Sequence, residues 1–140
     1  MDHYGPHDPW LIPFLSTIKG HPATYTGDWT VESLQRYMLA YGQARLDLGF
    51  PEFGTDEEEL LSQFDEWLVE RLKVARVSSG PGCAWAWYVK SVDPSPDNVE
   101  TFFALFEEFL ASIGRRLPKP RELVKRWPPA RGGAFTDPEK

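Results

Sequence analysis

The residue types that most often carry acid–base, nucleophilic or metal chemistry are scarce in this chain. Among the three histidines, His3 and His7 flank a Tyr-Gly-Pro stretch that prevents the helix needed to align both imidazoles on one metal. His21 stands before a proline in a predicted turn. The single cysteine, Cys83, has no histidine within 60 residues to serve as its base. We therefore predict no catalytic residue, no metal site and no cofactor.

Carboxylates are the remaining candidates for acid–base work. Asp65 lies between the apolar residues Phe64 and Trp67, whereas Glu66 and Glu70 are four residues apart and share a predicted solvent face. A catalytic pair needs one carboxyl whose pKa is raised in an apolar pocket. The sequence gives no sign of such a pocket, so we interpret these carboxylates as solvated and the protein as a non-enzyme.

Charge is divided unevenly along the sequence. Residues 1–70 contain 13 Asp and Glu against three Lys and Arg, a balance of −10, and residues 71–140 contain 8 against 12, a balance of +4. Ordinary solvated faces are one interpretation. The other is an acidic surface that attracts a basic protein partner. The candidate contacts are Asp56, Glu57, Glu58, Glu59, Glu66 and Glu70.

The positive charge gathers between Arg115 and Arg131, where seven basic residues meet only Glu122. Such a segment can contact phosphates, but the net charge of −6 on the whole chain would repel a polyanion elsewhere. A nucleic-acid-associated accessory protein is therefore the alternative hypothesis. Docking of this segment on the acidic helix of the same or a neighbouring molecule is a further one. The alternative contacts are Arg115, Arg116, Lys119, Arg121, Lys125 and Arg126.

Size and composition favour a folded protein of one domain, residues 1–140, with loose termini at about 1–9 and 128–140. With 41% hydrophobic residues, the chain can bury a core without disulfides or metals. Its start lacks a basic region followed by an apolar run, and no stretch approaches the roughly 18 apolar residues that span a bilayer. We expect a cytoplasmic protein that does not contact a membrane.

Two helices are predicted in the first half. One is capped by Asp28 or Thr30 and ends before Gly49. The other opens at Thr55, whose spacing to Glu58 is that of a capping box. Their apolar stripes are Val31, Leu34, Met38, Tyr41 and Leu48 in the first, and Leu60, Leu61, Phe64, Trp67, Leu68 and Leu72 in the second.

A third long helix is predicted with Ser95 as its cap, Pro96 in its first position and Gly114 after its end. Its stripe is Val99, Phe102, Phe103, Phe106, Phe109, Leu110 and Ile113. Shorter helices are predicted at residues 12–19 and 120–126.

The segment 83–92, CAWAWYVKSV, fits two periods. Alternation would place Trp85, Trp87 and Val89 on one side of a strand, and helical spacing would group Trp85 with Tyr88, Val89 and Val92. A strand would have no convincing partner strand, so we favour a short buried helix, with the aromatic side chains in the core. The expected core is led by Trp67, Trp85, Phe102, Phe103 and Phe106. These elements predict a mainly α, compact single-domain bundle of four to six helices.

Five stretches carry a family resemblance: GHPATYTGDW, LQRYMLAYGQA, FDEWLVERL, SSGPGCAWAW and TFFALFEEFL. Over about residues 12–112 the chain resembles small acidic bacterial proteins of unassigned function. It departs from them at His21 and Ala23, where arginine and methionine are typical, and at Tyr41-Gly42, where the order is inverted. Those proteins are similar in size and acidity to immunity proteins. The resemblance and the acidic half together predict a protein-binding module, an immunity-type inhibitor that neutralises a basic toxin domain.

Overall fold

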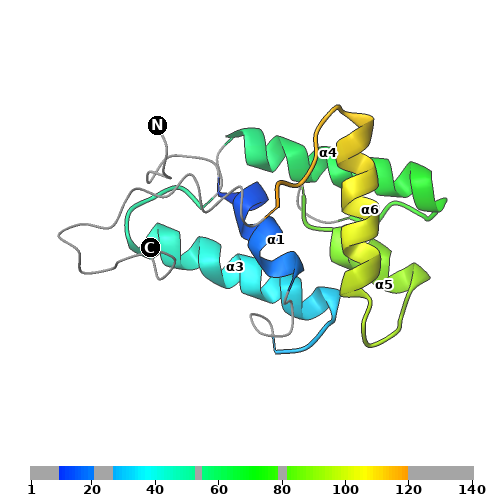
Figure 1. Cartoon of the computed structure of the whole chain (residues 1–140), viewed down its shortest axis with the longest axis horizontal. Helices are drawn as coiled ribbons and strands as arrows, with labels where there is room; N and C mark the ends of the chain where they lie inside the picture. Colours follow the sequence, from blue (N-terminus) through cyan, green and yellow to red (C-terminus); the bar gives the residue numbers. More distant parts are fainter. Residues whose placement is uncertain (1–9, 21–26, 53–54, 79–81, 120–140) are drawn as a thin grey trace, which may run out of the picture.

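A computed structural model of the protein shows a set of packed helices (Figure 1). The structure describes residues 10–20, 27–52, 55–78 and 82–119. Their helices are α1 (Leu11–Lys19), α3 (Val31–Asp47), α4 (Thr55–Leu72), α5 (Trp85–Val92) and α6 (Val99–Ser112). No strand occurs within those ranges, so the prediction of a mainly α bundle is confirmed. The predicted loose termini and the predicted helix at 120–126 lie outside the described residues.

The short helix α5 holds the long helices together. It contacts α3, α4 and α6, while α3 and α4 lie along opposite sides of the bundle with α1 between them (Figure 1). Trp85 of α5 is only 1% exposed, and its ring centroid lies 4.8 Å from that of Phe102. Phe64 of α4 meets Phe106 of α6 edge to face at 5.0 Å, a favourable geometry for aromatic pairs. The prediction of a short helix in segment 83–92 is therefore confirmed, with the helix at Trp85–Val92.

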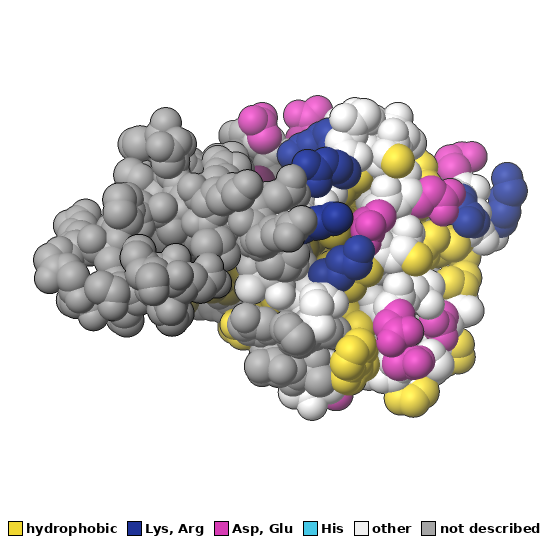
Figure 2. Space-filling view, viewed as in Figure 1, with side chains coloured by type: hydrophobic (Ala, Val, Ile, Leu, Met, Phe, Trp, Pro, Cys, Tyr) yellow, Lys and Arg dark blue, Asp and Glu magenta, His cyan; other side chains and the backbone are white. Residues whose placement is uncertain are grey.

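Most of the expected core is buried. Trp85, Phe102, Phe103 and Phe106 are all below 5% exposed, and Trp67 is half-buried against the same cluster. The space-filling view shows further hydrophobic side chains at the surface, between charged ones (Figure 2).

Several residues predicted to be in the core lie outside it. Trp87 is 61% exposed because a residue two positions from Trp85 points to the opposite side of a helix. Leu48 and Ile113 are 72% and 42% exposed, because they lie just beyond the ends of their helices. Tyr41 is 41% exposed within α3, with its ring against Trp10 and Phe14. Helical spacing therefore selected the correct face but extended it too far.

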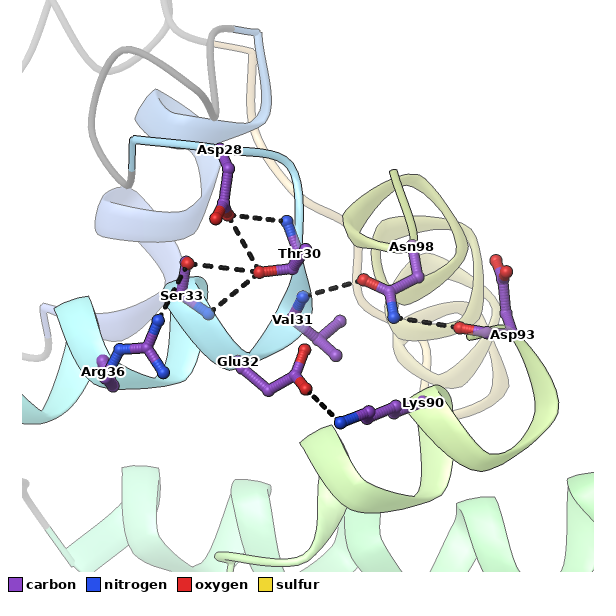
Figure 3. A network of polar contacts seen from close by, with 9 residues as sticks. All are labelled: Asp28, Thr30, Val31, Glu32, Ser33, Arg36, Lys90, Asp93 and Asn98. Atoms are coloured by element: carbon purple, nitrogen blue, oxygen red, sulfur yellow. Dashed lines mark hydrogen bonds and ion pairs between the residues drawn. The ribbon is translucent and has the colours of Figure 1, made fainter. Parts of the chain in front are cut away.

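The start of α3 is tied to the turn before α6 (Figure 3). Thr30 caps α3 as predicted, because its Oγ1 accepts a hydrogen bond from the Ser33 amide at 3.3 Å. The amide of Val31, which has no partner within the helix, donates to Oδ1 of Asn98 at 2.9 Å. Asn98 is 2% exposed and lies 67 residues away in the sequence. A buried side chain from another element thus completes this helix start.

The predicted start of α6 is wrong. The helix begins at Val99, and Ser95 instead bonds through its hydroxyl to the carboxylates of Asp93 and Asp97, at 2.6 and 2.8 Å. Those short bonds fold residues 95–98 into a turn rather than a first helical turn. Asn98 is held there by its Nδ2, which donates to the Asp93 carbonyl at 2.9 Å.

We predict that Asn98→Ala lowers the free energy of unfolding by about 2 kcal/mol, because it leaves the buried Val31 amide without an acceptor. Chemical denaturation measures the change. The matched control is Glu100→Ala, an exposed first-turn residue of α6, which should change stability by roughly 0.5 kcal/mol or less. Equal losses in the two variants would contradict the cross-element cap.

Candidate functional site

An acidic stripe runs along the solvent face of α4. It consists of Asp56, Glu59, Glu66 and Glu70, all exposed and spaced three, seven and four residues apart, so they follow one line on the helix. Figure 2 shows acidic side chains at the upper edge of the molecule, where α4 lies in Figure 1. Glu58 is also exposed but lies on another side of the helix, in line with Leu61 and not with the stripe.

Little of this charge is neutralised by nearby cations. Glu66 forms an ion pair with Arg76, and Arg71 of α4 is engaged by Glu108 of α6 at 2.7 Å. Within the described part of the chain, the carboxylates of Asp56, Glu59 and Glu70 take part in no ion pair. Asp56 and Glu59 therefore face solvent without an ion-pair partner among the described residues, while Glu70, after Glu66, adds to the negative potential that raises the pKa of Arg76.

A broad open groove of about 740 Å³ lies beside the stripe, between α4 and the end of α6. Glu59 and Glu66 line it together with the side chains of Trp67, Phe109 and Ile113. The Trp67 and Phe109 ring centroids are 5.8 Å apart, so apolar surface lies directly beside acidic groups. Sequence reasoning missed this groove because it assigned Trp67 and Phe109 to the core alone.

Glu57 does not belong to the acidic surface, contrary to the prediction. It is 5% exposed, and its Oε2 accepts hydrogen bonds from the backbone amides of Trp10, at 2.6 Å, and Leu11. These amides open α1, where the helix dipole favours a negative charge. Position on α4 explains the difference, because Glu57 is in line with the buried residues Leu60 and Phe64.

Asp65 also points inward, which corrects its interpretation as a solvated carboxylate. It is 8% exposed, and its Oδ2 accepts a hydrogen bond from the Ala84 amide, just before α5, at 3.1 Å. No described group bonds to its Oδ1. Burial raises the pKa of Asp65 to about 6, although backbone amides at Ala84, Gly82 and Cys83 act in the opposite direction.

The turn at residues 82–84 needs a glycine to reach Asp65. Gly82 has φ +75°, and a Cβ there would lie 2.8 Å from Cβ of Leu61. A side chain at this position would therefore be strained and would clash with α4. Glycine at position 82 thus permits close contact between the turn and α4.

Cys83 is exposed at this turn, but its thiol is poorly suited to act as a nucleophile. Although the residue is exposed, partial burial raises the pKa of the Cys83 thiol, and the nearby Asp65 and Glu52 raise it further. Among the described residues, no group of three or more His, Cys, Asp and Glu side chains could hold a metal ion. His3, His7 and His21 lie outside the described residues.

The basic segment is described only in part. Arg115, Arg116 and Lys119 are exposed after α6. They belong to the irregular segment that follows the helix. In the same segment, Leu117 packs against the core. Arg121, Lys125 and Arg126 lie outside the described residues.

Comparisons with known proteins found no match, so a functional proposal depends on the surface chemistry. No protein-family model matches the chain, and no curated protein or solved structure matches it significantly. Within the ranges that the structure describes, every helix is too short or too polar to span a bilayer.

Glu57→Ala should lower the free energy of unfolding by about 3 kcal/mol, because two buried amides lose a charged acceptor. Glu58→Ala, one residue away and exposed, is the matched control and should stay within roughly 0.5 kcal/mol of the wild type. Thermal and urea unfolding give both values. A Glu57→Ala protein as stable as the control would show that α1 does not depend on this carboxylate.

Asp65 should make stability depend on pH. Its pKa is raised in the folded protein from an ordinary 3.8 to about 6, so the folded state holds a proton that the unfolded state releases. Stability should therefore fall as pH rises from about 4 to 6 and level off above that. Asp65→Asn removes this contribution, so the stability of the variant relative to the wild type should rise by about 2 to 3 kcal/mol between pH 4 and pH 7. Denaturation at a series of pH values measures the difference, and a constant difference would refute the raised pKa.

Proposed function

We propose that this protein is a protein-binding module whose acidic stripe on α4 binds a basic protein partner. The observation that carries the proposal is the position of the stripe: four exposed carboxylates, of which Glu66 alone forms an ion pair among the described residues, lie on one line of a helix whose other face is buried. Such a surface raises the rate of encounter with a basic partner and disfavours acidic ones.

The groove beside the stripe supports the same function. Charged rims speed association, while affinity in protein interfaces comes mainly from a few buried aromatic or apolar anchors. Trp67 and Ile113 offer apolar surface for such an anchor, with Glu59 and Glu66 at the edge. A basic partner with an apolar residue beside its cationic patch would match this arrangement.

The specific role that we propose is that of an immunity-type inhibitor. Such a protein covers a basic toxin domain, whose cationic surface an acidic helix can complement over several turns. The length of α4, 18 residues, provides a stripe about 20 Å long between Asp56 and Glu70 at roughly 1.5 Å per residue. A stripe of that length can contact more than one basic group at once.

The proposal is tested by capture of the tagged protein from the cells that express it, after nuclease treatment. Two variants serve as matched baits. One reverses two acids of the stripe (Asp56→Lys, Glu59→Lys), and the other reverses two exposed acids elsewhere (Asp47→Lys, Glu100→Lys). Both change the net charge by the same amount, and both alter an acid in the first turn of a helix.

A basic protein recovered with the wild type and the second variant, but at least about tenfold depleted with the stripe variant, is the expected result. With the purified partner, stripe reversal should also slow association and weaken its dependence on salt. Equal recovery with both variants would show that the stripe is not the binding surface. Recovery that disappears on nuclease treatment would instead favour nucleic-acid association.

A further inference from the structure

A second, smaller pocket opens between α3, the start of α4 and the turn at residues 82–85. Its volume is about 160 Å³. Met38, Leu61 and Trp85 line its interior and are 3%, 4% and 1% exposed, so this part of the wall is apolar and belongs to the core. The pocket, termed here the α3–α4 pocket, therefore has a fixed floor.

The charged side chains that line this pocket are negative. Glu52 and Glu58 line the pocket, and no lysine or arginine does. Within the described ranges, neither carboxylate forms an ion pair or a hydrogen bond. The side chain of Glu52 lies against α3 at Gly42, where a Cβ would come 2.5 Å from its Cγ. Glycine at this position thus leaves room for the carboxylate beside the helix.

The pKa of a neighbouring thiol reflects the negative potential in the pocket. Cys83 lines the pocket, and both Asp65 and Glu52 raise the pKa of its thiol. Gln35, which also lines the pocket, is neutral, and its amide nitrogen donates to the Cys83 carbonyl at 3.1 Å. An anionic ligand would be repelled, and a purely apolar one would bury two carboxylates without a partner.

The volume of the pocket limits the size of the ligand that it can hold. A dry cavity of about 150 Å³ accommodates benzene, which has six heavy atoms. The arginine side chain beyond Cβ also has six heavy atoms. Its guanidinium carries five donors in a planar fork suited to carboxylates, and it stacks well on aromatic and apolar surfaces because it is weakly hydrated.

We infer that the α3–α4 pocket receives one arginine side chain of the protein partner, with its guanidinium between Glu52 and Glu58 and its methylenes against Met38 and Leu61. This inference rests on the proposed function, and it adds a specific anchor beyond the acidic stripe. Glu58 lies off the stripe, on the side of α4 that faces the pocket, so it contributes to the pocket and not to the stripe.

The pocket is tested without any partner protein, by titrating the full chain with n-propylguanidinium chloride. Nuclear magnetic resonance follows the Trp85 indole N–H and the Gly82 and Cys83 amides. N-propylurea, a neutral molecule of nearly the same shape, is the matched ligand control, and sodium chloride matches the ionic strength. We expect saturable shifts at these signals with a Kd of about 1–10 mM, as suits a ligand of so few atoms.

The Glu52→Gln, Glu58→Gln double variant should weaken binding of propylguanidinium by at least about fivefold while its spectrum stays that of a folded protein. Absence of saturable shifts, equal binding of propylurea, or unchanged affinity in the double variant would each overturn the inference. Such a failure would leave the variant-dependent capture on the stripe intact. If propylguanidinium binds but no basic protein depends on the stripe for its capture, the proposed function alone would be refuted.

Discussion

The structure depends on buried polar side chains that complete the beginnings of helices in other parts of the chain. Glu57 of α4 accepts from the amides that open α1, Asn98 from the first amide of α3, and Asp65 from the amide before α5. The first amides of any helix lack partners within it, and burying them unpaired is costly. Since these helix starts are packed inside the bundle, each requires an acceptor from outside.

This requirement fixes the orientation of α4. Glu57 and Asp65, eight residues apart, face inward toward two different helices, and the acidic stripe lies on the far side of the same helix. Rotation of α4 would remove both acceptors from their amides and bury charges that now face solvent. The contacts that position α1 and α5 therefore also hold the stripe, the groove and the α3–α4 pocket in place. Helix α4 thus carries the buried polar contacts on its inner face and the proposed binding surface on its outer face.

Local signals in the sequence were enough to predict the helices. Apolar spacing located α3, α4 and α6, and Thr30, Gly49 and Gly114 marked helix ends because capping acts over a few residues. The absence of a partner strand was enough to favour a helix at α5. Spacing overestimated the core at helix ends, because exposure there depends on which neighbours are present, and Trp87 was assigned to the core as an aromatic residue although helical spacing excludes it.

The candidate site was less predictable, because charge patterns do not reveal which acid serves a distant helix. Asp56, Glu57, Glu58 and Glu59 look alike in sequence, yet Glu57 alone is buried, and only the placement of α1 decides this. The alignment of Glu57 with Leu60 and Phe64 is the one local signal of its burial. Asp65 carried the same signal between Phe64 and Trp67. Asn98 carried none, since its partner Val31 is 67 residues away.

The most direct test of this account is amide hydrogen exchange of the native protein, read at Trp10, Leu11, Val31 and Ala84. Amides at helix starts normally exchange quickly, since only solvent or a cap engages them. Capping by buried side chains from other elements predicts that these four exchange as slowly as amides in the middle of the same helices. Exchange at the rates of an unprotected chain would mean that the helix starts are open, and that Glu57, Asp65 and Asn98 do not hold the bundle together.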